Sequence, residues 1–172
     1  MRQRIPPSPK GIDPDALALH TLLKALTAAS EWERAIALFE GASAAGVAAA
    51  ASASVTAAAI EACAAGASAN AASDAELARQ LARRASEYID RLSAQRLVPS
   101  AACYRGAIQA CAAASEASAA MALWQAMVRI DMVADAQTYG ALVRTLHAAG
   151  RHDEENLVLG HAERAGVPSE SL

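Results

Sequence analysis

The sequence predicts an all-α fold, an α-solenoid of stacked antiparallel helix-turn-helix repeats of about 35 residues each. The second half of the chain matches itself at this shift, so that Tyr104 falls on Tyr139 and Ile108 on Val143. Apolar stripes recur along the chain at helical spacing, two to a repeat. Glycine and proline mark the ends of the repeats. Because stacked units share their interfaces, function is expected on a surface summed over several repeats.

The predicted repeats cover residues 16–50, 53–100, 101–135 and 136–170. Each holds two stripes with the i, i+3, i+4, i+7 spacing that places four side chains on one face of a helix. In chain order the stripes are Leu19, Leu22, Leu23, Leu26; Ala35, Leu38, Phe39, Ala42; Thr56, Ala59, Ile60, Cys63; Ala85, Tyr88, Ile89, Leu92; Tyr104, Ala107, Ile108, Cys111; Ala120, Leu123, Trp124, Met127; Tyr139, Leu142, Val143, Leu146; and Glu155, Val158, Leu159, Ala162. Only Thr56 and Glu155 interrupt the apolar pattern, so we expect these faces to form one continuous core.

A few large side chains should anchor that core. The chain is 54% hydrophobic, but most of this is alanine and only 3% is aromatic. A buried alanine methyl contributes little hydrophobic free energy, so we expect a solenoid of modest stability. The expected anchors are Leu22, Leu26, Phe39, Ile60, Tyr88, Leu92, Tyr104, Ile108, Trp124, Met127, Tyr139 and Leu142.

Residues 1–15 should form a disordered tail and the end of a missing repeat. Three prolines, Pro6, Pro7 and Pro9, oppose a helix in the tail. Residues 11–15 then carry the glycine and proline that close a helical unit. We therefore expect the chain to be a piece of a longer repeat array, or to have lost its first unit.

The second repeat, 53–100, exceeds the common period by about 13 residues. The surplus lies near 67–79, which is rich in Ala, Ser and Asn at first and helical in character from Asp74 onward. With Gly66 at the inter-helix turn, we expect a longer loop and extra turns on the second helix. Insertions in solenoids map to loops on one face, so this segment is either a tolerated surface insertion or part of a contact face.

Stop signals separate the remaining helices. Ser115 and Gly150 lie between the two helices of the third and fourth repeats. The repeats end in Gly46-Val47, Leu97–Ser100, Met132–Asp135 and Gly166–Ser169. Glycine accepts a left-handed backbone and proline cannot donate the next hydrogen bond, so both end helices. Asp15 and Asp135 are placed to cap the helices that follow them.

Several classes of protein are disfavoured. Residues 44–67 carry one charge, but Ala, Ser and Gly supply too little transfer free energy for a membrane span. No apolar run follows the basic start, so no secretory signal is visible. We expect no enzyme, cofactor, metal or small-molecule substrate, because no phosphate loop, nucleophile elbow or paired carboxylate motif is present.

The metal-binding and catalytic alternatives rest on few residues. Cys63, Cys103 and Cys111 form no C-x-x-C pair, and two of them occupy equivalent stripe positions, so packing is favoured over metal binding. The histidines 147, 152 and 161 lack the i, i+4 spacing and nearby ligands that zinc requires. The acids at 153–155 begin a helix, where they favour the positive end of its dipole.

These features together resemble the pentatricopeptide repeat family, with about four degenerate repeats over residues 11–170. The resemblance rests on a first-helix Tyr, a Gly between helices, a late Met in the second helix and a Gly-x-x-Pro-Asp-like end. The stretches that carry it are Cys103–Cys111, Ala120–Met127, Thr138–Val143 and residues 11–15. The resemblance implies a right-handed superhelix and a role with RNA in an organelle, the mitochondrion or alternatively the chloroplast.

The resemblance also implies positions that contact RNA. In the family, one base per repeat is read by the residue after the first-helix Tyr and by the last residue of the repeat. The corresponding pairs are His20 with Ala50, Ala57 with Ser100, Arg105 with Asp135, and Gly140 with Glu170. None matches the family's usual polar choices in both slots, although base reading needs donors and acceptors. Of the positions expected to sandwich a base, which are Leu17, Ser54, Ala102 and Gln137, only the first is large and apolar.

Charge also opposes tight RNA binding. The net charge is −3, whereas affinity for RNA comes mainly from neutralised phosphates. A basic residue that the family often keeps late in the first helix is replaced by Ala28, Ala65, Ala113 and Ala148. Lys24, Arg105 and Arg144 remain on first helices, with Glu61 opposing them.

Two functional classes follow. The first is a non-enzymatic scaffold in an organellar ribonucleoprotein, with a mitochondrial ribosome as the preferred assembly, contacting protein, rRNA or both. The second is a single-stranded RNA-binding protein acting in organellar mRNA processing, stability or translation. The degenerate readout positions and the acidic balance favour the scaffold, while the resemblance favours RNA. A cytosolic protein-only adaptor is a third class.

Overall fold

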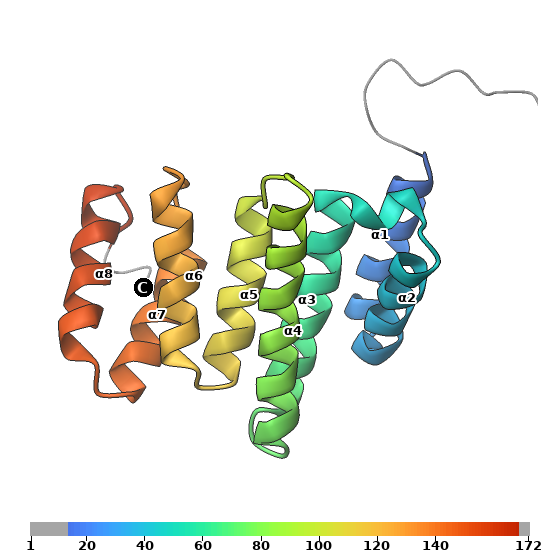
Figure 1. The fold of residues 1–172 in the computed structure, drawn as a ribbon. Helices are drawn as coiled ribbons and strands as arrows, with labels where there is room; N and C mark the ends of the chain where they lie inside the picture. The colour runs from blue at the N-terminus through green and yellow to red at the C-terminus, as the bar shows by residue number, and fades with distance from the viewer. Residues whose placement is uncertain (1–13, 169–172) are drawn as a thin grey trace, which may run out of the picture.

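The computed structural model describes residues 14–168 of the 172-residue chain, and this part is all-helical (Figure 1). Eight α-helices and one short 3-10 helix occur in it, and it contains no β-strand. The elements are α1 (Pro14–Ala28), α2 (Trp32–Ala44), η1 (Ala48–Ala51), α3 (Ala53–Asn70), α4 (Ala75–Ala94), α5 (Ala101–Ala113), α6 (Ala117–Arg129), α7 (Ala136–Ala148) and α8 (His152–Arg164). The predicted fold class is therefore confirmed. The tail and the unit end were expected at 1–15; residues 1–13 lie outside the described residues, and Pro14 and Asp15 belong to the first turn of α1 instead.

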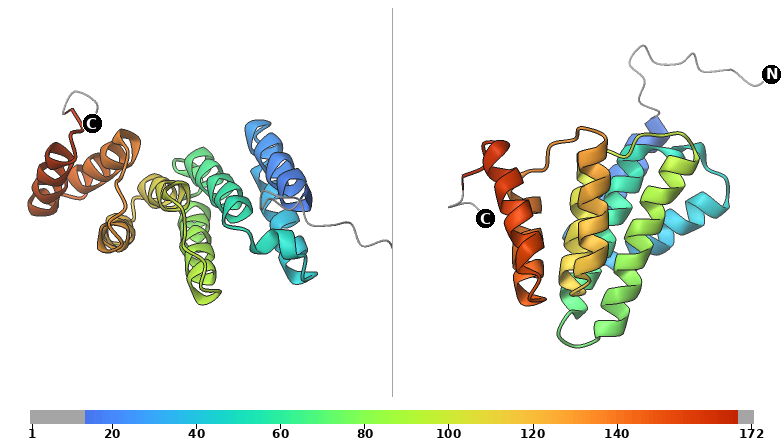
Figure 2. Two further views of the ribbon diagram at one scale, coloured as in Figure 1. Left: turned by 90° about the horizontal axis from the view of Figure 1, so that it is seen from above. Right: turned by 60° about the vertical axis from the view of Figure 1, so that its left-hand side comes forward.

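The helices form two layers. The first helices α1, α3, α5 and α7 pack in succession as one layer, and the second helices α2, α4, α6 and α8 form the other (Figure 2). Each second helix packs on the first helix of its own hairpin, and α2, α4 and α6 also contact the first helix of the next hairpin. The stack is therefore held by contacts between neighbours along the sequence, as expected for a solenoid.

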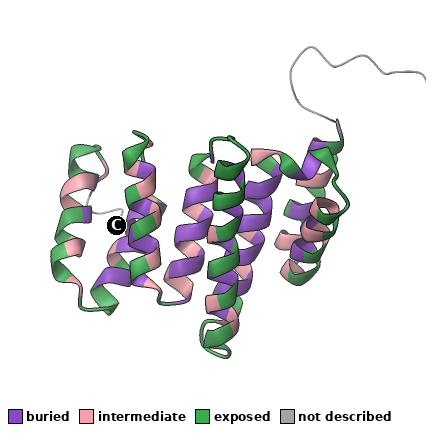
Figure 3. Cartoon of the chain, viewed as in Figure 1, coloured by how far each residue is buried: buried purple, intermediate pink, exposed green. Residues whose placement is uncertain are grey.

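The core follows the predicted stripes, with one correction in α1. Tyr88, Ile60, Ile108 and Tyr139 are fully or almost fully buried, in the band of buried residues seen along the helices (Figure 3). Leu22, an expected anchor, is instead 48% exposed, and α1 buries Leu23 and Ala16. The reason is that α1 is the first helix described and packs only against α2, η1 and α3, so its opposite face meets solvent.

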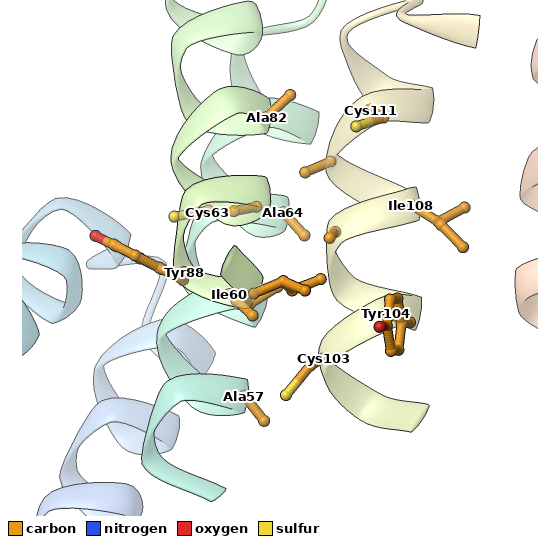
Figure 4. Close-up of a cluster of buried hydrophobic side chains, with 14 of the residues drawn as sticks. Ala57, Ile60, Cys63, Ala64, Ala82, Tyr88, Cys103, Tyr104, Ile108 and Cys111 are labelled. Atoms are coloured by element: carbon orange, nitrogen blue, oxygen red, sulfur yellow. The ribbon is translucent and has the colours of Figure 1, made fainter. Parts of the chain in front are cut away.

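Helix α3 is buried around most of its circumference because it packs against α1, α2, α4 and α5. Its alanines allow the α5 backbone to approach closely, and Figure 4 shows Ile60 and Ala64 on the side of α3 that faces α5. The approach requires Gly106 in α5, where an added Cβ would lie 2.9 Å from Cγ2 of Ile60. None of the helices in the described part is both long enough and apolar enough to span a bilayer.

A repeated stop motif ends seven of the eight described α-helices. In each of these helices, the second residue past the helix end has a left-handed backbone; these residues are Ser30, Gly46, Arg96, Ser115, Asp131, Gly150 and Gly166. The next amide then donates to the carbonyl five residues earlier, as from Glu116 to Cys111 at 2.8 Å. These bonds satisfy carbonyls that the helix end would otherwise leave free. The predicted turns at Ser115 and Gly150 are thereby confirmed, and Asp135 caps α7 by accepting from the Thr138 amide.

The second repeat has the extra turns predicted for its second helix but not the predicted longer loop. The inter-helix connection is short, from 71 to 74, and the surplus residues lengthen both helices, so that α3 has 18 residues and α4 has 20. Gly66 is not at a turn but inside α3, where an added Cβ would meet the Trp32 ring at 2.6 Å. The alanine-rich segment before Asn70 continues the helix because alanine has the highest helix propensity. Asp74 caps α4 by accepting a hydrogen bond from the Leu77 amide.

Candidate nucleic-acid interface on the first helices

The first helices α3, α5 and α7 line an open groove of about 680 Å³. Much of its lining is alanine: Ala64, Ala65, Ala112, Ala113, Ala141, Ala148 and Ala149. Its polar groups are Glu61, Ser68, Gln109, Ser115, Arg144 and Thr145. Small side chains leave room for another chain to approach the helices, so the groove suits a macromolecule lying along it.

Equivalent residues of the four repeats line up along this face. Lys24, Glu61, Gln109 and Arg144 stand at the same place in the four first helices, five residues after the start of each stripe. The last three line the groove. Arg144 is exposed, and no ion pair joins it to an acid within the described residues. It is the cation on this face that is free to meet a phosphate.

The other cations of this face are held by acids from neighbouring helices. Lys24 Nζ donates to one carboxylate oxygen of Glu61 at 2.5 Å, and Arg105 Nη2 lies 3.9 Å from the other. Arg105 Nη1 then donates to Asp135 Oδ2 at 2.9 Å. We call Lys24, Glu61, Arg105 and Asp135 the charge ladder; it links α1, α3, α5 and the start of α7. Two positive and two negative charges cancel there.

Asp135 is the most constrained member of the charge ladder. Burial acts to raise the pKa of its carboxyl, but hydrogen bonds from Thr138 and Arg105 outweigh it, so the pKa lies below its ordinary value. Its Oδ1 accepts from both the amide and the hydroxyl of Thr138, at 2.9 Å and 2.7 Å. Asp135 therefore stays ionised and keeps Arg105 engaged at neutral pH.

The first slots of the implied base-reading pairs offer little to a base. Nδ1 of His20 hydrogen-bonds the carbonyl of Ser54 at 3.0 Å. Arg105 is engaged in the charge ladder. Ala57 and Gly140 are buried and carry no side-chain donor or acceptor. The structure thus places these four positions on successive first helices but leaves none with an unengaged polar side chain.

The second slots are equally committed. Ala50 is buried in η1, Ser100 accepts from the Cys103 amide as the cap of α5, and Asp135 caps α7. Arg105 and Asp135, expected to read one base together, bind each other instead. Glu170 lies outside the described residues.

The remaining positions implied by the resemblance are also placed. Leu17, expected to sandwich a base, is 56% exposed on α1. Three of the alanines that replace the family's basic residue, Ala65, Ala113 and Ala148, line the groove. Methyl groups therefore stand where phosphate-binding cations would be needed, and phosphate affinity should be low.

The cysteines are free and buried, as interpreted from the sequence. Burial raises the pKa of the Cys63 thiol to about 12 and that of Cys111 to about 11. Cys103 hydrogen-bonds the carbonyl of Ala53 across the α3–α5 interface at 3.7 Å. Raised thiol pKa values disfavour the thiolate that nucleophilic or metal chemistry requires.

One cluster contradicts the sequence interpretation. His147 and His152 were expected to lack nearby ligands, yet the turn between α7 and α8 brings both to Glu155. The ligand atoms of the three side chains lie within 4.8 Å of one another. The signal available in the sequence was the spacing of His152 and Glu155, three apart at a helix start, following a histidine at the previous helix end.

Comparison with known proteins supports the fold. The structure is similar to two solved structures of the pentatricopeptide repeat protein PPR10 in complex with an 18-nt psaJ RNA element, one of them of a triple cysteine-to-serine variant. Each has a TM-score of 0.68 and 24% sequence identity, over 93% of this chain and 21% of that chain. This chain therefore spans about a fifth of the length of that protein.

The sequence itself matches no family model and no curated protein. At 24% identity the likeness to the solved structures concerns the fold. The chain has the helical-repeat fold of a pentatricopeptide repeat protein, and at that level the resemblance seen in the sequence is confirmed.

Proposed function

We propose that this chain is a non-enzymatic helical-repeat scaffold in an organellar ribonucleoprotein. The preferred assembly is a mitochondrial ribosome, in which the chain would contact protein, rRNA or both. The observation that carries this proposal is the charge ladder, because it occupies the polar side chains that a single-stranded RNA would have to engage.

The charge ladder leaves the first-helix face close to neutral. Lys24 and Arg105 are matched by Glu61 and Asp135, and Arg144 adds one positive charge. Since each neutralised phosphate contributes to affinity, about one contact would give weak, salt-sensitive binding. A surface of this kind favours a partner that is recognised by shape over one recognised by sequence.

The alanine lining supports the same conclusion. Small side chains let a helix or a structured backbone approach closely, as Ala and Gly already do between α3 and α5. A groove of about 680 Å³ has room for side chains or a sugar-phosphate backbone from a docked partner. In a large assembly many weak contacts add, so each surface need not bind tightly by itself.

A second candidate function rests on Arg144 and on the structural comparison. Arg144 and Gln109 project into the groove with no ion pair to an acid among the described residues, and the solved structures of similar fold contain an RNA element. Under this alternative the chain binds single-stranded RNA in organellar mRNA processing, stability or translation. The charge ladder would then have to open on binding.

The first experiment is native purification. The tagged chain is expressed in cells, mitochondria or chloroplasts are enriched, and their lysate is separated on a sucrose gradient. The proposal expects co-sedimentation with a ribosomal subunit that survives moderate salt. Migration with free mRNA, abolished by ribonuclease that spares ribosomal subunits, would favour the alternative; recovery only in the cytosol would refute both.

The second experiment measures RNA binding directly. Fluorescence anisotropy is recorded with a panel of 18-nt single-stranded RNAs of different sequence and with a stem-loop RNA, at low and physiological salt. The scaffold proposal expects weak binding without sequence preference. Sequence-dependent binding to single strands, reduced by Arg144→Ala, would reverse the order of the two functions.

A further inference from the structure

The turn between α7 and α8 gathers two imidazoles around one carboxylate. Nδ1 of His147 lies 3.1 Å from Oε1 of Glu155, and Nδ1 of His152 lies 3.0 Å from Oε2. The two imidazole rings are edge to face, with centroids 5.5 Å apart. Two nitrogen donors from different helices therefore converge on the two oxygens of the same side chain.

We propose that His147, His152 and Glu155 form a binding site for a divalent transition metal ion, with zinc as the reference ion. Two imidazoles and one carboxylate are a ligand set that suits Zn²⁺, and three protein ligands leave positions for water. This site lies at the turn of the last hairpin and is independent of the proposed function.

The distances suit such an ion. With bonds of about 2.0–2.1 Å, two ligand atoms in tetrahedral positions stand about 3.4 Å apart. The observed separations of 3.1 Å and 3.0 Å are slightly shorter, because each imidazole now hydrogen-bonds the carboxylate. At these two pairs, replacing the hydrogen bonds by metal bonds requires a spreading of a few tenths of an ångström, and the ligand atoms of all three side chains already lie within 4.8 Å of one another. Side-chain rotation supplies this, since both histidines are on the surface.

The backbone of the site is already fixed. His152 and Glu155 are three residues apart in the first turn of α8, so they share one face of it. His147 is in the last turn of α7, and the left-handed Gly150 reverses the chain between them. The Gly150 amide donates to the carbonyl of His147 at 3.0 Å, which ties this ligand to the turn. Little backbone conformational entropy therefore remains to be lost when the metal binds.

Electrostatics are balanced in favour of a cation. The positive end of the α8 dipole opposes it, but Asp153, Glu154 and Glu155 all lie in that first turn. Arg151, the nearest cation in sequence, is engaged by Glu154 at 2.6 Å and by Ser118 at 2.8 Å. The last carbonyls of α7 contribute further negative potential. The net local field thus favours a divalent cation.

Access is also suitable. The side chains of His147 and His152 are 70% and 64% exposed, whereas that of Glu155 is only 16% exposed. A metal would enter from solvent and sit above a carboxylate held by the protein. Because the histidines are exposed and their outer ring nitrogens make no hydrogen bond to the described protein, we expect reversible binding that is weaker than at a structural zinc site.

The test uses the full chain, freed of metal with a chelator, and titrates ZnCl2 by isothermal calorimetry. We expect one ion per chain. Glu155→Gln removes a ligand and should weaken binding at least about tenfold. The matched control is Glu163→Gln, which makes the same substitution at an exposed position near the other end of α8, outside the cluster. It should change the affinity less than about threefold.

A second readout locates the ion. In NMR spectra, Zn²⁺ should shift the imidazole signals of His147 and His152 and leave those of His20 and His161 in place. The side chain of Glu155 is only partly exposed, so circular dichroism is used to verify that both variants are folded. Three results would overturn the proposal: no binding up to about 1 mM zinc, equal affinity in Glu155→Gln and the wild type, or equal losses in both variants.

Discussion

The charge ladder predicts a gain of RNA affinity when its acids are removed. Glu61→Gln releases Lys24, which it holds at 2.5 Å, and weakens the tie to Arg105 at 3.9 Å. Adding Asp135→Asn releases Arg105, while asparagine preserves the cap of α7. The pairs are partly exposed, so each contributes about 0–1 kcal/mol and the variants should remain folded.

The magnitude follows from counterion release. A single-stranded RNA loses affinity with a slope of about −0.7 in log K against log salt for each phosphate contact. With Arg144 as the unpaired cation among the described residues of the first-helix face, the wild type should show a slope near −0.7 for this face; the single variant should approach −1.4 and the double variant −2.1. Relative to 1 M salt, each contact is then worth about eightfold at 50 mM, so the double variant should bind about 60-fold more tightly.

The assay is fluorescence anisotropy with an 18-nt oligouridine at several salt concentrations between 50 and 300 mM. The control is Glu31→Gln, which makes the same charge change and releases Arg34 at the turn between α1 and α2, away from the groove. It should leave the slope unchanged. If Glu61→Gln gives neither tighter binding nor a steeper slope than this control, the charge ladder does not lie on a surface that can contact RNA. A wild-type slope already steeper than −2 would show that the pairs are open in solution.

Three stability predictions follow from the packing. Gly106→Ala should lower the free energy of unfolding by about 1 kcal/mol, because overpacking of the new Cβ against Ile60 at 2.9 Å outweighs the gain in helix propensity. Gly41→Ala, whose Cβ would meet nothing within 4 Å, should raise the free energy of unfolding by about 1 kcal/mol. Thermal melts that show equal stabilisation of the two variants would contradict the close approach of α3 and α5. Ser115→Gly should stabilise the protein by about 0.5–1 kcal/mol in urea titrations, since the left-handed backbone at φ 58° strains any residue with a Cβ, and a destabilised variant would argue against that conformation. Burial raises the pKa of Cys63 from 9.0 to about 12, so the thiol ionises at a lower pH in the unfolded chain than in the folded protein. The contribution of this thiol to the free energy of unfolding is therefore fully present below pH 9, and it should be lost at up to about 1.4 kcal/mol per pH unit between pH 9 and pH 12. Cys63→Ala should flatten this alkaline slope, and an unchanged slope would show that the thiol is not buried.

Much of the architecture could be predicted because it is encoded over short distances. The apolar stripes around Ile60, Tyr88 and Ile108 predicted which faces are buried, since their spacing fixes them on one side of a helix. Left-handed stops at Ser115 and Gly150 could be placed from residue type and register. The extra turns on the second helix of the second repeat were predicted correctly, but the preceding part of the surplus was misassigned as a loop, because an Ala, Ser and Asn-rich segment is compatible with either state until packing decides. The contact between the Trp32 ring and Gly66 could not be predicted from any local sequence pattern.

The candidate site could be predicted from the sequence only in part. The sequence identified Lys24, Arg105 and Arg144 as the cations of the first helices and Glu61 as their opponent. It did not reveal that Arg105 and Asp135, 30 residues apart, bind each other and so cancel as readout positions. The cluster at the last turn was dismissed for the same reason, since spacing in the sequence does not show what a chain reversal brings together.

The sequence by itself determined the helices, their order and their buried faces, because periodicity, propensity and stop signals act within a few residues. Only the tertiary structure decided which charges are free, which ligands converge and how closely α3 and α5 approach. These depend on the rotation and separation of neighbouring repeats, where a shift of about one ångström makes or breaks an ion pair. Such a shift is the sum of many small packing contacts between helices, and no single stretch of sequence contains it.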